Sequence, residues 1–349
     1  MYPLFRPFLF RLDPEDAHHL TLQLVRLAGV LPPSRWLLQG LFSAPEKPVE
    51  AFGLHFKNPV GLAAGYDKDS IAVRGLATLG FGHLEIGTVT PRAQPGNPRP
   101  RVFRLVEDQA VINRMGFPGQ GAGFAAAHLQ KALKGRPTHG NVGTRKLPII
   151  GINLGKNKDT PLEEAADDYV SLMRSFAPLA DYLAINISSP NTAGLRRLQG
   201  RDMLENLLSA IGQERRANAL PNGRRIPILV KLAPDLTDDE LEDALDVILS
   251  NGMDGVIATN TTLGRAGLRS RRQNETGGLS GNPLRLRSEM VLAQVLKRLD
   301  GRIPVVSAGG IMCPEDAKRR LDMGAALVQV FTGLVYAGPG LVQKIIRAV

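Results

Sequence analysis

Eight short apolar runs recur along this chain after Pro48, and helical stretches separate most of them. The runs are Val60–Ala63, Leu84–Val89, Ile149–Leu154, Tyr182–Ile187, Ile226–Leu232, Gly255–Thr259, Ile303–Ala308 and Leu327–Phe331. Near-continuous apolar strands that alternate with helices are typical of a parallel sheet covered on both faces. We therefore predict an α/β fold, a (β/α)8 TIM barrel.

Helical patterns support this fold, and two long connections interrupt it. The predicted helices are Thr160–Ala177, Gly200–Ala219, Thr237–Asn251, Ser288–Leu299 and Pro314–Met323. A doubly wound sheet is the alternative, but it more often has a glycine-rich turn directly after the first strand. The long connections are Thr90–Pro148, with a possible hairpin of Arg101–Leu105 and Ala110–Asn113, and the polar segment Asn260–Pro283. Such insertions usually build the site or its lid.

The N-terminal segment predicts a two-helix extension over residues 1–44, before a barrel domain over residues 45–349. Asp13 is a good helix cap, and Pro32–Pro33 ends the first helix. A second short helix is predicted over Ser34–Phe42. These apolar helices are flanked by arginines, so they could lie in a membrane interface or pack on the barrel as an ordinary hairpin. We expect neither a membrane-spanning segment nor a signal peptide.

Charge and composition narrow the possible partners. The net charge of +10 favours phosphate, carboxylate, an acidic membrane surface or nucleic acid, although a basic solvated surface explains it equally well. Arg269–Arg272 lacks interleaved aromatic residues, so we expect no nucleic-acid partner. The six histidines show no metal-ligand spacing, and we predict no metal site. The single cysteine, Cys313, excludes an intrachain disulfide and favours a reducing compartment.

Polar residues gather where the predicted strands end, which is where a barrel places its active site. In strand order they are Ala64, Gly65, Tyr66, Asp67 and Lys68; Thr88; Asn153; Asn186 and Ser189; Lys231; Thr259, Asn260 and Thr261; Gly309 and Gly310; and Phe331 and Thr332. These amides, hydroxyls, glycines and two lysines suit a large planar ligand that carries a phosphate. Gly309–Gly310 and Thr332–Gly333 occupy the usual phosphate position of a barrel, although a glycine pair can also be only a tight turn.

The segment Asn186–Asn191 is the strongest indication of chemistry. It places two amides and two hydroxyls directly after an apolar strand. We predict Ser189 as the catalytic residue. The G-x-S-x-G pattern of a hydrolase elbow is absent, so an acylating serine is not the natural interpretation.

Six motifs in order make the chain resemble the dihydroorotate dehydrogenase family. They are Asn58–Gly65, Glu85–Thr90, Asn113–Phe117, Asn186–Asn191, Ala258–Thr262 and Gly277–Gly281. One class of this family is soluble and has a cysteine as catalytic base. The other is membrane-associated, uses a quinone, has a serine base and adds an N-terminal helical extension. Ser189 and the predicted extension resemble the second class.

The resemblance implies oxidation of dihydroorotate to orotate in pyrimidine (UMP) biosynthesis. A hydride would pass to FMN and the electrons to a membrane quinone, with the protein bound peripherally at the cytoplasmic face of the cell membrane. The implied FMN residues are Ala64, Gly65, Tyr66, Asp67, Lys68, Thr88, Asn153, Asn186, Lys231, Thr259, Gly281, Gly310, Phe331 and Thr332. The implied substrate residues are Lys68, Asn113, Arg114, Met115, Gly116, Phe117, Asn186, Asn191, Asn260 and Thr261.

Further expectations follow from the same resemblance. Ser189 would remove a proton from C5 of the substrate, with a water relay through Thr192. Arg104 is a candidate quinone contact. Phe331 departs from the tyrosine that relatives often carry, and it lacks that hydroxyl donor. Two alternatives remain: a flavin barrel that reduces uridine in tRNA, which calls for a cysteine acid and an RNA-binding appendage, and a non-enzymatic phosphate-binding barrel on membranes, which leaves Lys68 and Ser189 unexplained.

Overall fold

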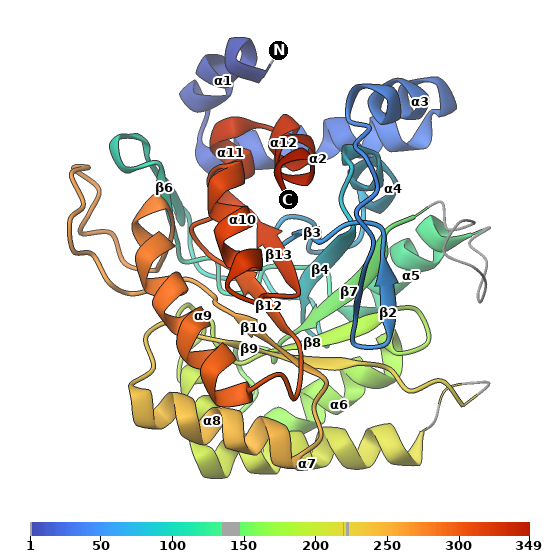
Figure 1. The fold of residues 1–349 in the computed structure, drawn as a ribbon, viewed down its shortest axis with the longest axis vertical. Coiled ribbons are helices and arrows are strands. Elements are labelled where there is room, and N and C mark those ends of the chain that lie inside the picture. Colours follow the sequence, from blue (N-terminus) through green and yellow to red (C-terminus); the bar gives the residue numbers. More distant parts are fainter. Residues whose placement is uncertain (1, 135–146, 219, 221–222) are drawn as a thin grey trace.

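A computed structural model describes the chain except for residues 1, 135–146, 219 and 221–222. Eight parallel strands close into a barrel in chain order (Figure 1), which confirms the predicted fold. The strands are β3 (Val60–Leu62), β4 (His83–Val89), β7 (Ile149–Leu154), β8 (Tyr182–Asn186), β9 (Ile228–Leu232), β10 (Gly255–Ala258), β12 (Val305–Ala308) and β13 (Leu327–Val330). All eight fall on the apolar runs of the sequence.

Helices surround the barrel and close part of its rim. They are α4 (Val73–Leu76), α5 (Ala122–Leu133), α6 (Ala165–Phe176), α7 (Arg201–Ala217), α8 (Asp238–Ser250), α9 (Arg285–Leu299), α10 (Pro314–Asp322), α11 (Thr332–Ala337) and α12 (Gly340–Ala348). The five predicted helices correspond to α6–α10. Helix α6 begins later than predicted, because Thr160 lies in the preceding loop. There its carbonyl accepts from Lys156 Nζ and its hydroxyl donates to Asp168. Residue 219, the predicted end of α7, lies outside the described residues.

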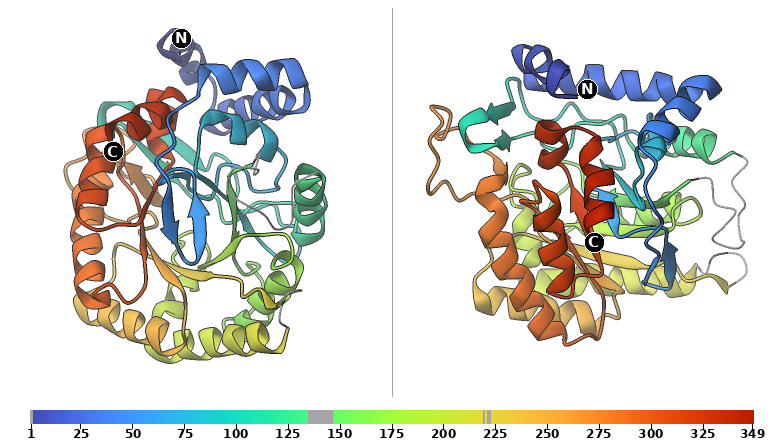
Figure 2. Two further views of the ribbon diagram at one scale, coloured as in Figure 1. Left: turned by 45° about the vertical axis from the view of Figure 1, so that its right-hand side comes forward. Right: turned by 45° about the horizontal axis from the view of Figure 1, so that its top comes forward.

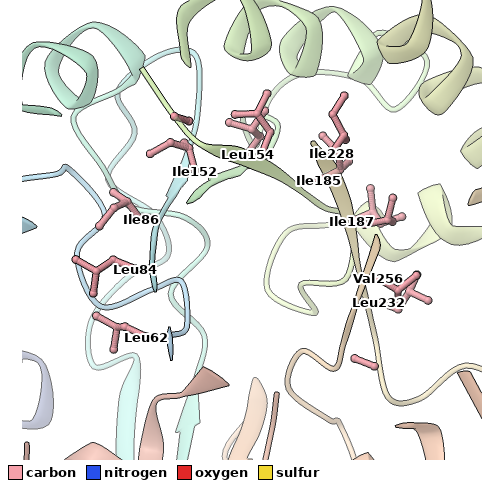
Figure 3. Close-up of a cluster of buried hydrophobic side chains, with 14 of the residues drawn as sticks. Leu62, Leu84, Ile86, Ile152, Leu154, Ile185, Ile187, Ile228, Leu232 and Val256 are labelled. Carbon is pink, nitrogen blue, oxygen red and sulfur yellow. The ribbon is translucent and has the colours of Figure 1, made fainter. Parts of the chain in front are cut away.

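Alternation along the strands separates an outer apolar layer from the barrel interior. On β7, for example, Ile150, Ile152 and Leu154 pack against the helices. Figure 3 shows this outer layer continuing over neighbouring strands with side chains such as Leu84 and Ile185. The intervening residues of each strand point inward, because successive side chains of a strand face opposite sides. The sequence of each strand thus determines what the interior contains.

The barrel interior is apolar at the amino ends of the strands and polar at the carboxyl ends. At the amino end, a hairpin of β1 (Val49–Ala51) and β2 (Leu54–Phe56) closes the barrel, and Phe56 belongs to an apolar cluster with Ile149, Tyr182 and Ile257. Further along the same strands the inward positions carry charged and amide side chains. Within the described part of the barrel interior, the carboxyl end is therefore where polar groups are offered to a ligand.

Three helices, rather than the predicted two, form the N-terminal extension: α1 (Tyr2–Arg11), α2 (Pro14–Val30) and α3 (Pro32–Leu41). In the right-hand view of Figure 2 they lie across the top of the barrel, next to α11 and α12. Helix α1 contains Pro7, which weakens the sequence signal because proline removes a helix hydrogen bond. Tertiary contacts stabilise it, since the Tyr2 hydroxyl donates to Val335 O and the ring of Phe10 contacts Tyr336.

Helix α2 holds the extension on the barrel through two close contacts. Gly29 crosses Gly75 of α4 so closely that a Cβ on Gly29 would lie 2.3 Å from Gly75 N. At the other end, the buried carboxylate of Glu15 forms an ion pair with Arg101, at 2.7 Å. Removing one partner of a buried pair typically costs about 3–5 kcal/mol, so this contact should fix the position of α2.

The two long connections meet above the barrel mouth in a three-stranded antiparallel sheet. Strands β5 (Val102–Leu105) and β6 (Ala110–Asn113) form the predicted hairpin. The third strand, β11 (Gly278–Gly281), pairs with β6 and was not predicted. It lies in the polar segment Asn260–Pro283 and brings that segment onto the first connection. Residues 135–146 of the first connection lie outside the described part.

Buried His83 is expected to make stability depend on pH. Burial lowers the pKa of His83 to about 4, whereas the unfolded chain has about 6.5. Between these values the unfolded chain binds more protons, so the free energy of unfolding falls as the pH drops from about 6.5 towards 4. The loss is about 1.4 kcal/mol per pH unit. Thermal unfolding should show that the wild type loses stability relative to His83→Phe when the pH is lowered from 7.5 to 5.

The neighbouring residue Phe56 provides the control for this measurement. Phe56→Leu should keep the pH dependence of the wild type, because it removes ring contacts with His83 but no titratable group. An equal difference between wild type and His83→Phe at both pH values would contradict the prediction.

Candidate active site

One cavity of about 700 Å³ connects the strand ends with the N-terminal helices. Its inner part is lined by polar residues at the carboxyl ends of the barrel strands. Its outer part is lined by apolar residues of α1–α3, among them Phe5, Leu9 and Leu38. A polar ligand can therefore bind in the inner part of the cavity, while an apolar ligand reaches the same inner surface from the outer part.

Nearly all the predicted site residues line this cavity. They are Ala64, Gly65, Tyr66, Lys68, Thr88, Asn113, Met115, Gly116, Phe117, Asn186, Ser189, Asn191, Lys231, Thr259, Asn260, Thr261, Gly281, Gly310, Phe331 and Thr332. Three predicted residues do not. The Asp67 carboxylate accepts from Ile71 N and Ala72 N within its own turn. Arg114 pairs with Glu275 outside the cavity. Asn153 lies beneath the lining residues.

Asn153 supports the inner surface from below. Its Oδ1 accepts from Thr88 Oγ1 at 2.6 Å and from Asn186 Nδ2 at 2.9 Å, and its Nδ2 donates to Glu85. These bonds fix which way the amides of Asn153 and Asn186 face. The inner surface is therefore organised before any ligand binds, which lowers the cost of binding.

Further asparagines converge beside Asn186. Asn260 Nδ2 donates to Ser188 Oγ at 3.0 Å, and Asn191 Nδ2 donates to Asn113 Oδ1 at 3.1 Å. Asn191 Oδ1 is buried and has no hydrogen-bond partner in the described part of the chain. A buried acceptor without a partner is costly, so this atom favours a ligand that presents an N–H group.

Ser189 lies in the wall of the inner cavity and is 5% exposed. Its Oγ accepts from Asn191 N at 3.2 Å. No histidine among the described residues is bonded to it, which argues against a serine–histidine nucleophile pair. The neighbouring Thr192 is buried, and its Oγ1 has no partner in the described residues. The two hydroxyls lie three residues apart in one loop.

Two lysines bring positive charge to the inner cavity. Lys68 Nζ donates to Gly65 O at 2.8 Å. Burial lowers the pKa of Lys68, and the carboxylates of Glu15 and Asp69 oppose that shift. Lys231 forms an ion pair with buried Glu85, at 3.3 Å. These ammonium groups favour a ligand with carboxylate or other anionic groups.

Gly309 and Gly310 form a cradle at the end of β12. Both have positive φ, and a Cβ on Gly310 would lie 2.3 Å from Arg285 Cα. The Gly309 carbonyl accepts from Ser288 Oγ at 2.8 Å and from the buried Arg320 at 3.2 Å. In a trans peptide the N–H points away from the carbonyl, so the Gly310 N–H points away from Arg320. Such a glycine cradle suits a phosphate group.

Several polar side chains interrupt the apolar outer part, among them Arg104 and His18. Arg104 donates to the carbonyls of Leu9 and Leu12, and it lies over the ring of Phe10 at 4.7 Å. His18 of α2 also lines the cavity, and burial lowers its pKa to about 3, so it is neutral at pH 7. The ring centroids of His18 and Tyr66 are 4.9 Å apart, and those of Tyr66 and Phe331 are 6.0 Å apart. This row of rings connects the two parts of the cavity.

Sequence reasoning missed His18, Glu85 and Gln329. A single histidine on an amphipathic helix gives no signal for a cavity. The sequence did contain a signal for Glu85, because a charged residue inside an apolar barrel strand must find buried polar partners. Gln329 stands inside an equally apolar strand, and it lines the cavity floor.

The fold and site together define a (β/α)8 barrel with a polar cavity at the carboxyl ends of its strands, which is where barrel enzymes place their active sites. The family model described as dihydroorotate dehydrogenase matches residues 48–349. This chain belongs to the dihydroorotate dehydrogenase family.

Curated relatives match over the whole chain. A protein of Halorhodospira halophila named dihydroorotate dehydrogenase (quinone) is 49% identical over all of this chain and 97% of its own length. A protein of Paraburkholderia phymatum with the same name is 46% identical, with the same coverage. The crystal structure of Eimeria tenella DHODH in complex with ferulenol superimposes with a TM-score of 0.87. Its identity is 39%, and the match covers 96% of this chain and 90% of that one.

Proposed function

We propose that the protein oxidises dihydroorotate to orotate for pyrimidine biosynthesis, with FMN as cofactor and a membrane quinone as electron acceptor. The observation that carries this proposal is the single cavity in which a polar, asparagine-lined inner part meets an apolar outer part. A polar heterocycle fits the first and a quinone fits the second. The names of the relatives, which specify the quinone, support it.

FMN is proposed to lie over the carboxyl ends of the strands. The donor set fits it: Thr88, Asn186, Lys231 and Thr259 offer hydroxyl, amide and ammonium groups. The Gly309–Gly310 cradle, together with Thr332, would hold the phosphate. When bound, FMN supplies the chemistry that amino acids lack, which is acceptance of a hydride and release of the electrons to a second substrate.

Dihydroorotate is proposed to bind among the asparagines, against the Asn113–Phe117 segment. Each asparagine offers a donor and an acceptor to the amides of the ring. The free Oδ1 of Asn191 would accept from a ring N–H. Lys68 would pair with the carboxylate of the substrate. These contacts orient C5 of the ring towards a base.

Ser189 is the proposed general base that takes the proton from C5. It is the hydroxyl in the wall of the inner cavity next to Asn186 and Asn191. A free serine is a poor base, so the proton must move on. Thr192, with its unpartnered Oγ1, is the proposed next group, through a water molecule.

The outer part of the cavity is proposed as the quinone site. Arg104 and His18 are polar groups inside a mostly apolar wall, and each could bond a quinone carbonyl. Phe331 has no hydroxyl, so at this position it can offer only ring contacts. Residues 1–44 would then be a quinone-binding extension, and residues 45–349 the catalytic barrel.

Peripheral binding at the cytoplasmic face of the cell membrane is the proposed location. Large apolar side chains on α1–α3 are exposed, among them Phe8, Leu27, Trp36 and Leu37. An exposed apolar surface of this kind with arginines beside it suits a membrane interface. Among the described residues, no helix has both the length and the apolar character that crossing a bilayer requires.

Anaerobic titration of the purified protein tests the proposed function. We expect the protein to hold FMN, dihydroorotate to bleach the flavin absorbance, and a quinone to restore it. Fumarate and NAD should not restore it. Protein that takes up no FMN, or bound FMN that dihydroorotate does not bleach, would rule the proposal out.

A further inference from the structure

A buried carboxylate lies beneath the cavity and has no part in the chemistry proposed above. Glu85 is on β4, faces the barrel interior and is 0% exposed. Its Oε1 accepts from Asn153 at 2.8 Å and from Lys231 at 3.3 Å. Its Oε2 accepts from Gln329 at 2.6 Å and from the Tyr182 hydroxyl at 3.3 Å. An ionised carboxylate only accepts hydrogen bonds, so four donors around it suit the charged form.

Two of these four donors reach the floor of the cavity directly. Lys231 and Gln329 both line it. Within the described residues, Glu85 is the one group to which Lys231 Nζ donates, although an ammonium group has three N–H donors. Gln329 Oε1 has no partner there either. Glu85 therefore anchors two side chains whose remaining polar groups are left for a ligand.

Lys231 needs a partner of this kind. It is 5% exposed at the end of an apolar strand, and burying an ammonium group without a carboxylate is costly. Lys68, the other lysine of the cavity, follows β3 and donates to the backbone carbonyl of Gly65. Glu85 is the carboxylate that compensates the charge of Lys231.

We propose that Glu85 is a positioning residue that keeps Lys231 charged and directed at the cavity floor, and that it thereby sets the redox potential of bound FMN. This inference rests on the proposed FMN-dependent function. The reduced cofactor carries more negative charge than the oxidised one, so a fixed cation beside it favours reduction. The carboxylate behind Lys231 keeps that cation in place in both redox states.

The variant Glu85→Gln removes the charge and keeps the size of the side chain. Without the carboxylate, burial favours the neutral form of Lys231 over a wider pH range. Reduction of bound FMN then draws one additional proton onto Lys231. We expect the midpoint potential of bound FMN to fall more steeply with pH in the variant than in the wild type. The extra slope corresponds to a tenfold change in the equilibrium constant for reduction per pH unit, which is about 30 mV per pH unit for a two-electron couple.

Two further variants separate action through Lys231 from a general disturbance. In Glu85→Gln combined with Lys231→Gln, the extra slope should disappear because no amine remains to take the proton. Glu214→Gln is the matched control. Glu214 is a buried glutamate on α7 that is bonded to Arg174 and Asn218, away from the cavity. This control should keep both the slope and the potential of the wild type.

Each outcome decides the proposal. The wild type and Glu85→Gln are first compared for FMN content and for the dissociation constant of FMN. If the wild type binds no FMN, the proposed function itself fails. If both bind it and show the same potential at every pH, the role of Glu85 is overturned. If Glu85→Gln does not fold, Lys231→Gln tests the pair alone, and a potential equal to that of the wild type would overturn the proposal.

Discussion

Replacing Ser189 with alanine is expected to slow reduction of bound FMN by dihydroorotate by roughly 10²–10⁴-fold, the usual contribution of a general base. The side chain lies in the cavity wall, and its Oγ is bonded to Asn191 N, so it is held beside the proposed substrate contacts. Alanine removes the base and little else. Stopped-flow absorbance should show this loss in the reductive half-reaction, with quinone reoxidation near the wild-type rate.

The neighbouring serine is the matched control. Ser188 Oγ is fully buried and bonded to Asn186 and Asn260, so it supports the asparagines without facing the substrate. Ser188→Ala should cost about 5- to 30-fold, the effect of losing one or two hydrogen bonds of about 1 kcal/mol each. Ser189→Cys should restore part of the rate, with a pH profile that follows a thiol. Equal losses in both half-reactions of Ser189→Ala would refute the base assignment.

Strand periodicity explains why so much of the site could be predicted. In a barrel strand the residue after the last apolar position lies at the carboxyl rim, so the position of Asn186 or Lys231 follows from the sequence alone. The structure brings these strand ends into one cavity. Asp67 and Arg114 show the limit of this reasoning. A motif gives the position of a residue along the chain, but it does not give the direction of the side chain.

Non-local packing explains most of what could not be predicted. Strand β11 is short and glycine-rich, and it exists because it pairs with β6 far away in the chain. Helix α1 contains a proline and is stabilised by contacts with α11. His18 becomes part of a cavity only once α2 is placed over the barrel. Local propensity carries no information about any of these contacts.

Deleting residues 1–42 is expected to spare FMN binding and reduction by dihydroorotate while lowering the rate of reoxidation by quinone by roughly 100-fold. The inner cavity is built by the barrel, whereas α1–α3 supply the apolar outer wall and the carbonyls of Leu9 and Leu12 that hold Arg104. Losing burial of only three to four methylene groups, at about 0.8 kcal/mol each, accounts for such a factor.

A shorter deletion and a different acceptor identify the cause. Deleting residues 1–12 removes α1 but keeps α2, which the Glu15–Arg101 pair and the Gly29–Gly75 crossing still hold. The rate of reoxidation by quinone in this shorter deletion should lie between the rates of the wild type and of the 1–42 deletion. A small water-soluble acceptor should reoxidise all three proteins equally, because it needs no apolar wall.

Sedimentation with phospholipid vesicles tests the membrane role of the same helices. Only proteins that retain α2 and α3, with exposed Leu27 and Trp36, should sediment. Full quinone activity in the 1–42 deletion would exclude the extension as the quinone site. Unchanged vesicle binding in that deletion would place the membrane contact elsewhere on the barrel. Because the two measurements can fail separately, they also decide whether quinone binding and membrane binding share one surface.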